Sequence, residues 1–129
     1  MTLTCKLIDE PTDDDRAAVW QAMLHDPGAD IDSVMAGAAL YGIYQQSACI
    51  GRLLLRFEGQ EAVIVAAVGR LPGVALVGAV WPWLESRLRE MGATSVRFHT
   101  RRRGLIANMA RYGFTAAEVV MRKGLNDGR

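Results

Sequence analysis

Residues 61–76, with the sequence EAVIVAAVGRLPGVAL, decide the fold, because they join a buried strand to a helix through one turn. Apart from Glu61, every residue as far as Val68 is apolar, which is typical of a strand covered on both faces at the middle of a sheet. A charge and a Pro-Gly pair interrupt the apolar run at residues 70–73 and predict a turn.

The helix predicted after this turn extends from Val74 to Met91, and Gly92 is a suitable C-cap. Pro82 lies in its interior, where the missing donor and a steric clash disfavour regular helix. Two alternatives stay open: a kink at Pro82, or a regular helix that begins only there. A membrane hairpin is a further alternative, since Arg70 is the only charge from Ala62 to Leu84. A charge beside a turn favours two buried elements instead.

The rest of the chain supplies strands and helices on both sides of this segment. In order, we expect a strand at Cys5–Ile8, a helix capped by Thr12, a short helix at Ile31–Ala36, a hairpin of Leu40–Tyr44 and Ala48–Phe57, a strand at Thr94–His99, a helix at Arg101–Arg111 and a last strand at Ala116–Lys123. This order predicts an α/β (α+β) fold with helices on both faces of a mixed sheet. We expect one domain over residues 1–129, with an ordered part at 3–125.

The composition agrees with one small globular domain, since half of the 129 residues are apolar, 22% are charged and the net charge is +1. Cys5 and Cys49 have no ligand-type neighbours, so we expect no disulfide framework and no metal site, with Cys49 as a small buried hydrophobe. The first residues do not resemble a secretory signal, and we expect a cytoplasmic location. Trp20, Trp81 and Trp83 are expected in the core, with the wall of a substrate cleft as the alternative.

Charge is unevenly distributed along the chain. Residues 1–40 hold eight acids and two bases, a net charge of −6, and residues 41–129 hold six acids and thirteen bases, a net charge of +7. An anionic partner of the second part, or an ordinary dipolar surface, would explain this asymmetry. Arg101, Arg102 and Arg103 open a predicted helix, where they suit phosphates, an acidic substrate, nucleic acid or simply solvent. Nucleic acid is disfavoured, because no exposed aromatic residues are interleaved with them.

The turn after the buried strand is the best candidate for an anion site. Small residues at Gly73 and Ala75 let the backbone approach a ligand, and free N–H groups at the start of the next helix can bind a phosphate. A plain connection between a strand and a helix would have a similar sequence.

In this turn the chain resembles the GNAT family (Gcn5-related N-acetyltransferases), whose acyl-CoA loop has the pattern R/Q-x-x-G-x-G/A. Arg70, Gly73 and Ala75 fit that pattern, and Tyr112-Gly113-Phe114 fits the Gly-Phe that precedes the family's last strand. The resemblance implies a GNAT-like, mostly antiparallel sheet that is splayed between its fourth and fifth strands, with acetyl-CoA in the cleft. It also implies direct acetyl transfer to a primary amine of a small molecule or peptide, while a homodimer stays open.

The same resemblance assigns the residues that would bind the cofactor. Backbone groups of Val65, Ala66 and Ala67 would bind the pantetheine arm, although these residues would have the same side chains as plain core. The diphosphate would lie on the turn and the start of its helix, at Arg70, Leu71, Pro72, Gly73, Val74, Ala75 and Leu76.

Two residues are candidates for the general base that the attacking amine needs. Glu61 matches the base glutamate on the fourth strand of histone-type members, and we expect a raised pKa for a carboxylate at the edge of an apolar strand. His99 ends the next strand, and the ordinary pKa of histidine lies near neutral pH. Either residue could instead be an ordinary surface side chain.

One position departs from the family's pattern. Many members have a tyrosine four residues before the glycine of the Gly-Phe pair, where it protonates the thiolate of coenzyme A, and Met109 stands there. Methionine cannot donate a proton, and Tyr112 would occupy the usual aliphatic core position. Either water is the acid, or the chain is a binding or structural module with the GNAT fold and no catalysis, which Pro82 also favours. A nucleic-acid-associated protein is the third alternative.

Overall fold

The computed structural model describes residues 3–23, 30–69, 76–100 and 103–125, with residues 76–79 described by their backbone only. Within these ranges the chain forms five strands and four helices. The strands are β1 (Leu3–Leu7), β2 (Ala39–Gln45), β3 (Ala48–Glu58), β4 (Glu61–Gly69) and β5 (Ser95–Phe98), and the helices are α1 (Asp13–Met23), α2 (Ile31–Met35), α3 (Leu76–Glu90) and α4 (Arg103–Ala110). Every element expected before residue 111 is present, with slightly shifted bounds.

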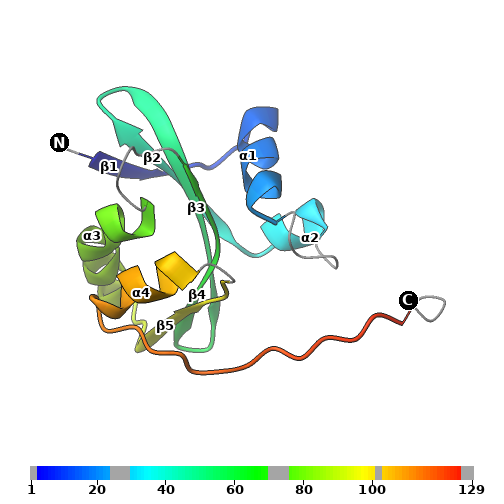
Figure 1. Ribbon diagram of the computed structural model, residues 1–129. Coiled ribbons are helices and arrows are strands. Elements are labelled where there is room, and N and C mark those ends of the chain that lie inside the picture. Colours follow the sequence, from blue (N-terminus) through cyan, green and yellow to red (C-terminus); the bar gives the residue numbers. More distant parts are fainter. Residues whose placement is uncertain (1–2, 24–29, 70–75, 101–102, 126–129) are drawn as a thin grey trace.

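The strands form one sheet in the order β1-β2-β3-β4-β5. The pairs from β1 to β4 are antiparallel, whereas β4 and β5 are parallel. Helices α1 and α2 lie on one face of the sheet, and α3 and α4 lie on the other (Figure 1). The expected mixed, mostly antiparallel sheet with helices on both faces is therefore confirmed. Because a parallel pair needs a crossover connection, α3 links β4 to β5.

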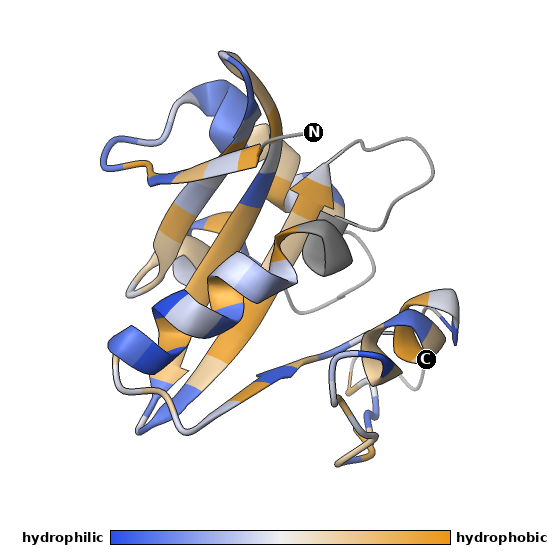
Figure 2. Cartoon of the chain, turned by 90° about the vertical axis from the view of Figure 1, so that its left-hand side faces the viewer, coloured by the Kyte–Doolittle hydropathy of each residue, from blue (hydrophilic) through white to orange (hydrophobic). Residues whose placement is uncertain are grey.

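Each face of the sheet buries its own apolar cluster. Ile43 and Leu53 belong to the cluster that packs against Leu84 of α3. Leu54, the next residue on β3, points to the opposite face and packs with Val19 of α1. Strand β4 supplies residues to both clusters, which explains its nearly continuous apolar sequence. The strands are mainly orange in Figure 2, whereas much of the blue lies on helix surfaces and turns.

Helix α1 begins with the cap that the sequence predicts. The Thr12 N–H donates to Asp15 Oδ2 at 2.9 Å, and the Asp15 N–H donates to Thr12 Oγ1 at 3.1 Å. This reciprocal pair satisfies donors that the first turn leaves free. Asp15 also accepts a hydrogen bond from Arg52 Nε on β3 at 2.7 Å, so the same carboxylate fixes the helix to the sheet.

Helix α3 begins at Leu76 and continues through Pro82, so a regular helix that starts only at Pro82 is wrong. Pro82 is exposed, while Trp81 and Leu84 beside it are buried. Burial of that apolar face outweighs the loss of one helical hydrogen bond. Gly92 ends the helix with a φ of +91°, as its C-cap role requires.

The strand expected at residues 116–123 is wrong. Residues 114–125 contain no helix or strand, and the side chains of residues 115–125 are exposed. The local sequence favours a strand, but a strand is stable only when a neighbouring strand pairs with its backbone. In this structure the segment has no such neighbour.

Some burial expectations also need correction. Cys49 is exposed rather than buried. Trp81 is 5% exposed and confirms its place in the core, whereas Trp20 and Trp83 are 38% and 40% exposed. In the described ranges, no helix is long and apolar enough to cross a membrane.

We predict that Asp15→Asn lowers the free energy of unfolding by about 1–3 kcal/mol at neutral pH, because it weakens a cap and a charged hydrogen bond. Burial opposes ionisation of Asp15, but hydrogen bonds from the Thr12 N–H and from Arg52 outweigh it and lower the pKa of Asp15. A lowered pKa stabilises the fold above the ordinary carboxyl pKa. The difference between wild type and variant should therefore disappear as the pH falls through the native pKa of Asp15, as urea unfolding at several pH values can measure.

Asp14→Asn is the matched control, because Asp14 lies in the same turn and is exposed. It should change stability far less than Asp15→Asn. Equal effects of the two variants would contradict the role given to Asp15.

Candidate functional site

The pairing of β4 with β5 ends partway along β4, and we call the unpaired outer edge of β4 beyond that point the opening. Their parallel pairing runs from Glu61 opposite Ser95 to Ile64 opposite Phe98. Beyond this point β4 continues to Gly69, while β5 has ended. In the described part of the chain, no strand pairs with residues 65–69 on the side away from β3. This side of β4 therefore offers main-chain donors and acceptors to a ligand.

A β-bulge lies at the start of the opening. On β3, Leu55 pairs with Ile64 and Leu54 pairs with Ala66, so Val65 has no partner. Val65 packs with the cluster under α1, as Ala66 does, whereas Ala67 packs with the cluster under α3. A bulge interrupts the ladder and redirects backbone groups, as is common beside active sites. The side chains of these three residues belong to the core, and their backbone groups lie along the opening.

Helix α3 starts at Leu76, shortly after β4 ends at Gly69. The predicted diphosphate turn, Arg70, Leu71, Pro72, Gly73, Val74 and Ala75, lies outside the described residues. Its two ends are nevertheless defined, because it connects the open end of β4 to a helix N-terminus, where unpaired N–H groups and the helix dipole favour an anion.

His99 lies at the mouth of the opening. It follows Phe98, which makes the last parallel pair with Ile64, and its side chain is exposed. In the β4–β5 register, His99 is therefore the first residue after the end of β5, and it comes next to the bulged residue Val65. Arg103 at the start of α4 is exposed, whereas Arg101 and Arg102 lie outside the described residues.

Glu61 lies at the other end of β4, in an ionic network. Its carboxylate accepts hydrogen bonds from Ser95 Oγ at 2.8 Å and from Arg97, which also pairs with Glu58. The hydrogen bonds from Ser95 and Arg97 lower the pKa of Glu61, and the two carboxylates raise the pKa of Arg97. The raised pKa expected for Glu61 is therefore wrong, because the neighbouring strand supplies a cation. Glu61 is about 13 Å from Val65 along the strand, at ~3.3 Å per residue.

The two residues considered for the acid lie at the C-terminal end of α4 and shortly after it. Met109 is 1% exposed and belongs to the core. Tyr112, expected in the core, is 36% exposed at the end of the helix. Phe114 packs instead, with its ring centroid 4.9 Å from that of Trp81 and 5.2 Å from that of Phe98.

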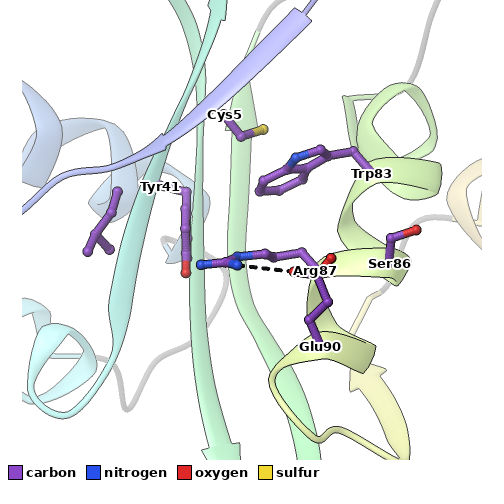
Figure 3. Close-up of a pocket in the computed structure, with 7 residues that line it drawn as sticks. Cys5, Tyr41, Trp83, Ser86, Arg87 and Glu90 are labelled. Carbon is purple, nitrogen blue, oxygen red and sulfur yellow. Dashed lines mark hydrogen bonds and ion pairs between the residues drawn. The ribbon is translucent and has the colours of Figure 1, made fainter.

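A separate groove, lined in part by Trp83, lies between α3 and the β1–β2 side of the sheet. It has a volume of about 390 Å³ and is lined by Cys5, Leu7, Tyr41, Trp83, Ser86, Arg87 and Glu90. Figure 3 shows Trp83 and Arg87 projecting from α3 toward the strands. The rings of Trp83 and Tyr41 meet edge-on, with their centroids 6.3 Å apart. Burial raises the pKa of the Cys5 thiol, so the thiol form is favoured.

The described residues contain no cluster of three or more histidine, cysteine, aspartate or glutamate side chains that could hold an ion.

Comparisons with known proteins relate the fold to acetyltransferases. No protein-family model and no curated protein matches the sequence. Among solved structures, an acetyltransferase from Bacillus subtilis in complex with CoA has a TM-score of 0.71 and 17% identity, covering 96% of this chain and 91% of that one. A GNAT family acetyltransferase from Elizabethkingia anophelis with acetyl-CoA bound has a TM-score of 0.72 and 16% identity, covering 90% and 78%. Glucosamine-6-phosphate N-acetyltransferase from Arabidopsis thaliana has a TM-score of 0.64 and 14% identity, covering 98% and 100%. The chain therefore has the GNAT fold.

We predict that Arg97→Gln raises the pKa values of both Glu58 and Glu61, because their common cation is removed. Carboxyl chemical shifts recorded by NMR across a pH titration would measure both values. Arg56→Gln is the matched control: Arg56 pairs with Glu58 alone, at 3.0 Å, so that variant should leave Glu61 unchanged. An unaltered Glu61 titration in Arg97→Gln would contradict the network.

Proposed function

We propose that the protein is a single-domain acyl-CoA-dependent N-acyltransferase that transfers an acetyl group directly from acetyl-CoA to a primary amine. The observation that carries this proposal is the coincidence of the β4 bulge with the end of the β4–β5 pairing. This arrangement leaves main-chain groups open beside a turn that leads to a helix N-terminus. Two proteins with the same fold were solved with CoA or acetyl-CoA bound.

The cofactor would extend the sheet. Main-chain groups of Val65, Ala66 and Ala67 would hydrogen-bond the amides of the pantetheine arm, as a strand does at an open edge. Residues 70–76 would then receive the diphosphate at the start of α3. The alanines in this part of β4 present small side chains, so a ligand can approach the backbone closely.

The reaction needs three groups. The neutral amine attacks the thioester carbonyl and a C–N bond forms, and N–H groups at the bulge would stabilise the oxyanion that develops. The C–S bond then breaks and coenzyme A leaves as a thiolate. The proton lost by the amine goes to a base, and the thiolate takes a proton from an acid.

We assign the base to His99, directly or through one water. His99 is exposed at the mouth of the opening and continues the strand that pairs with β4. Glu61 is the less suitable base, because its hydrogen bonds from Ser95 and Arg97 favour the charged carboxylate and weaken its affinity for a proton. With Met109 buried, water would protonate the thiolate.

The acceptor would approach over α1 and α2. The first turn of α1 carries Asp13 and Asp14, both exposed, whereas Asp32 of α2 already pairs with Arg16. The two exposed carboxylates of α1 favour a cationic amine, on a small molecule or peptide, by electrostatic attraction. Both cysteines are free, which suits a reducing compartment such as the cytoplasm.

A binding module without catalysis is the second candidate. The lowered pKa of Glu61 and the burial of Met109 favour it, because neither residue is then suited to proton transfer. Such a module would still be stabilised by a bound ligand, so a thermal shift combined with an assay for free thiol separates the candidates. Binding with no turnover of any amine would favour the module, and steeply salt-dependent DNA binding would indicate a nucleic-acid partner instead.

We predict that Gly73→Leu abolishes the binding of acetyl-CoA measured by calorimetry, because a side chain at this position would separate the diphosphate from the backbone. Gly104→Leu is the matched control, since a Cβ at Gly104 on α4 would meet no atom within 4 Å. The control should bind acetyl-CoA as wild type does. Equal affinities of both variants and wild type would remove the turn from the binding site.

We also predict that His99→Gln lowers kcat by about 10²–10⁴-fold, the usual contribution of a general base, with little change in the KM for acetyl-CoA. The acidic limb of the pH–rate profile should disappear. Glu61→Gln should retain that limb and most of the rate. If Glu61→Gln loses activity and His99→Gln does not, the assignment of the base is reversed.

A further inference from the structure

The groove between α3 and the β1–β2 side of the sheet takes no part in the transfer reaction proposed above. Strands β2 and β3 lie between β1 and β4. With ~4.8 Å between neighbouring strands, β1 is about 14 Å from β4, whose outer edge forms the opening. The groove volume of about 390 Å³ is within the range of small-molecule sites. The groove is therefore a candidate for a second binding site.

One face of β1 and β2 forms the strand wall of the groove. Leu7 pairs with Tyr41 in the antiparallel register, and Cys5 lies two residues before Leu7 and on the same face. Lys6 points to the other face, where its ammonium lies over the Tyr44 ring. Cys5 packs with the apolar cluster under α3, whereas Leu7 is exposed. The strand wall is therefore apolar, except for the hydroxyl of Tyr41.

The helix wall carries most of the polar groups. Trp83, Ser86, Arg87 and Glu90 have the spacing i, i+3, i+4 and i+7, so they form one stripe along α3. Figure 3 shows the Arg87 side chain extending across the groove, with its guanidinium directed toward the Tyr41 hydroxyl. Trp83 is exposed although its ring also contacts Tyr41. Much of the indole surface is therefore available to a ligand.

The Tyr41 hydroxyl is the feature that points to a ligand. Tyr41 is only 8% exposed, yet its hydroxyl has no hydrogen-bond partner among the described residues. Buried polar groups normally have such a partner. Every fully enclosed side-chain N or O atom in the described ranges is hydrogen-bonded, so this hydroxyl must be accessible from the groove. A ligand in the groove would supply the missing partner.

Arg87 supplies the positive charge. Its Nη1 donates to Glu90 Oε2 at 3.2 Å, which uses one of the five N–H donors of the guanidinium. This pair is exposed, and exposed ion pairs contribute little to stability. A ligand carboxylate can therefore use the remaining donors, or replace Glu90, without a large cost. Guanidinium groups bind carboxylates through two parallel hydrogen bonds.

We propose that this groove binds a small aromatic carboxylate. The ring of the ligand lies against the Trp83 indole and Leu7, and its carboxylate accepts hydrogen bonds from the Arg87 guanidinium and the Tyr41 hydroxyl. A cationic ligand is disfavoured, because the guanidinium extends across the same space with a like charge. An anion without a ring would leave the exposed apolar surface of Trp83 and Leu7 uncovered.

Phenylacetate is the probe, without acetyl-CoA in the sample. Calorimetry measures its affinity, and the NMR signal of the Trp83 indole Nε1–H reports its place. We expect saturable binding with a Kd of about 1 mM, which a fragment of this size can reach. Phenylacetamide, which has nearly the same shape and no charge, should bind at least tenfold more weakly, and so should acetate. Phenethylamine, a cation of similar size, should not bind.

Variants identify the groups that bind the carboxylate. Arg87→Gln should weaken phenylacetate binding at least tenfold, and Tyr41→Phe, which keeps the ring, should weaken it several-fold. Glu90→Gln should bind at least as tightly as wild type, because a competing carboxylate is removed. Arg89→Gln is the matched control, since Arg89 lies on the same helix, pairs with Glu85 and does not line the groove. It should bind phenylacetate as wild type does.

Three results would overturn the proposal: a Trp83 signal that does not respond to phenylacetate, equal affinities of Arg87→Gln and wild type, or tighter binding of phenethylamine than of phenylacetate. Shifts confined to residues 65–69 would place the probe in the opening and would also contradict it. The measurements use no acetyl-CoA, so their outcome is independent of the proposed transferase activity.

Discussion

Strand β4 is covered by apolar side chains on both faces, but its pairing with β5 ends at Ile64, about halfway along its length. The arrangement of the other strands and of the candidate site depends on this constraint. Apolar side chains from β4 enter both clusters, so the strand cannot move away from the core. Beyond Ile64 no described strand pairs with its outer edge, so main-chain groups there can pair with a ligand. A ligand that carries amides can make this pairing. The bulge at Val65 marks the point where pairing with protein ends and pairing with a ligand can begin.

The two ends of β4 have different electrostatic environments. At the closed end, Glu61 and Glu58 share Arg97, and their charges are held in a network that stabilises the ionised forms. At the open end, the strand leads to a helix N-terminus and His99, without a described ion pair between them. Proton transfer needs a group that can change its charge readily near neutral pH. The network at the closed end makes Glu61 poorly suited to this role, because it favours the ionised carboxylate.

Much of the fold could be predicted because it depends on local patterns. The cap at Thr12, the glycine that ends α3 and the period-two strands each depend on neighbouring residues, and the structure confirms them. The predictions that were wrong concern features that depend on residues far apart in the chain. The pKa of Glu61 is lowered by Ser95 and Arg97, more than thirty positions away in the chain. The strand at 116–123 failed because a strand needs an edge, which the sequence of the segment does not contain.

The sequence by itself determined the order of strands and helices as far as residue 110 and the buried character of β4. These features depend on side-chain period and on turn and cap residues that are close together in the chain. Only the tertiary structure decided where the pairing of β4 with β5 ends, that Val65 is bulged, which carboxylates pair with Arg97 and that residues 116–123 form no strand. Each of these features is a relation between segments far apart in the chain. Such relations are set by packing of the whole sheet, which no short stretch of sequence specifies.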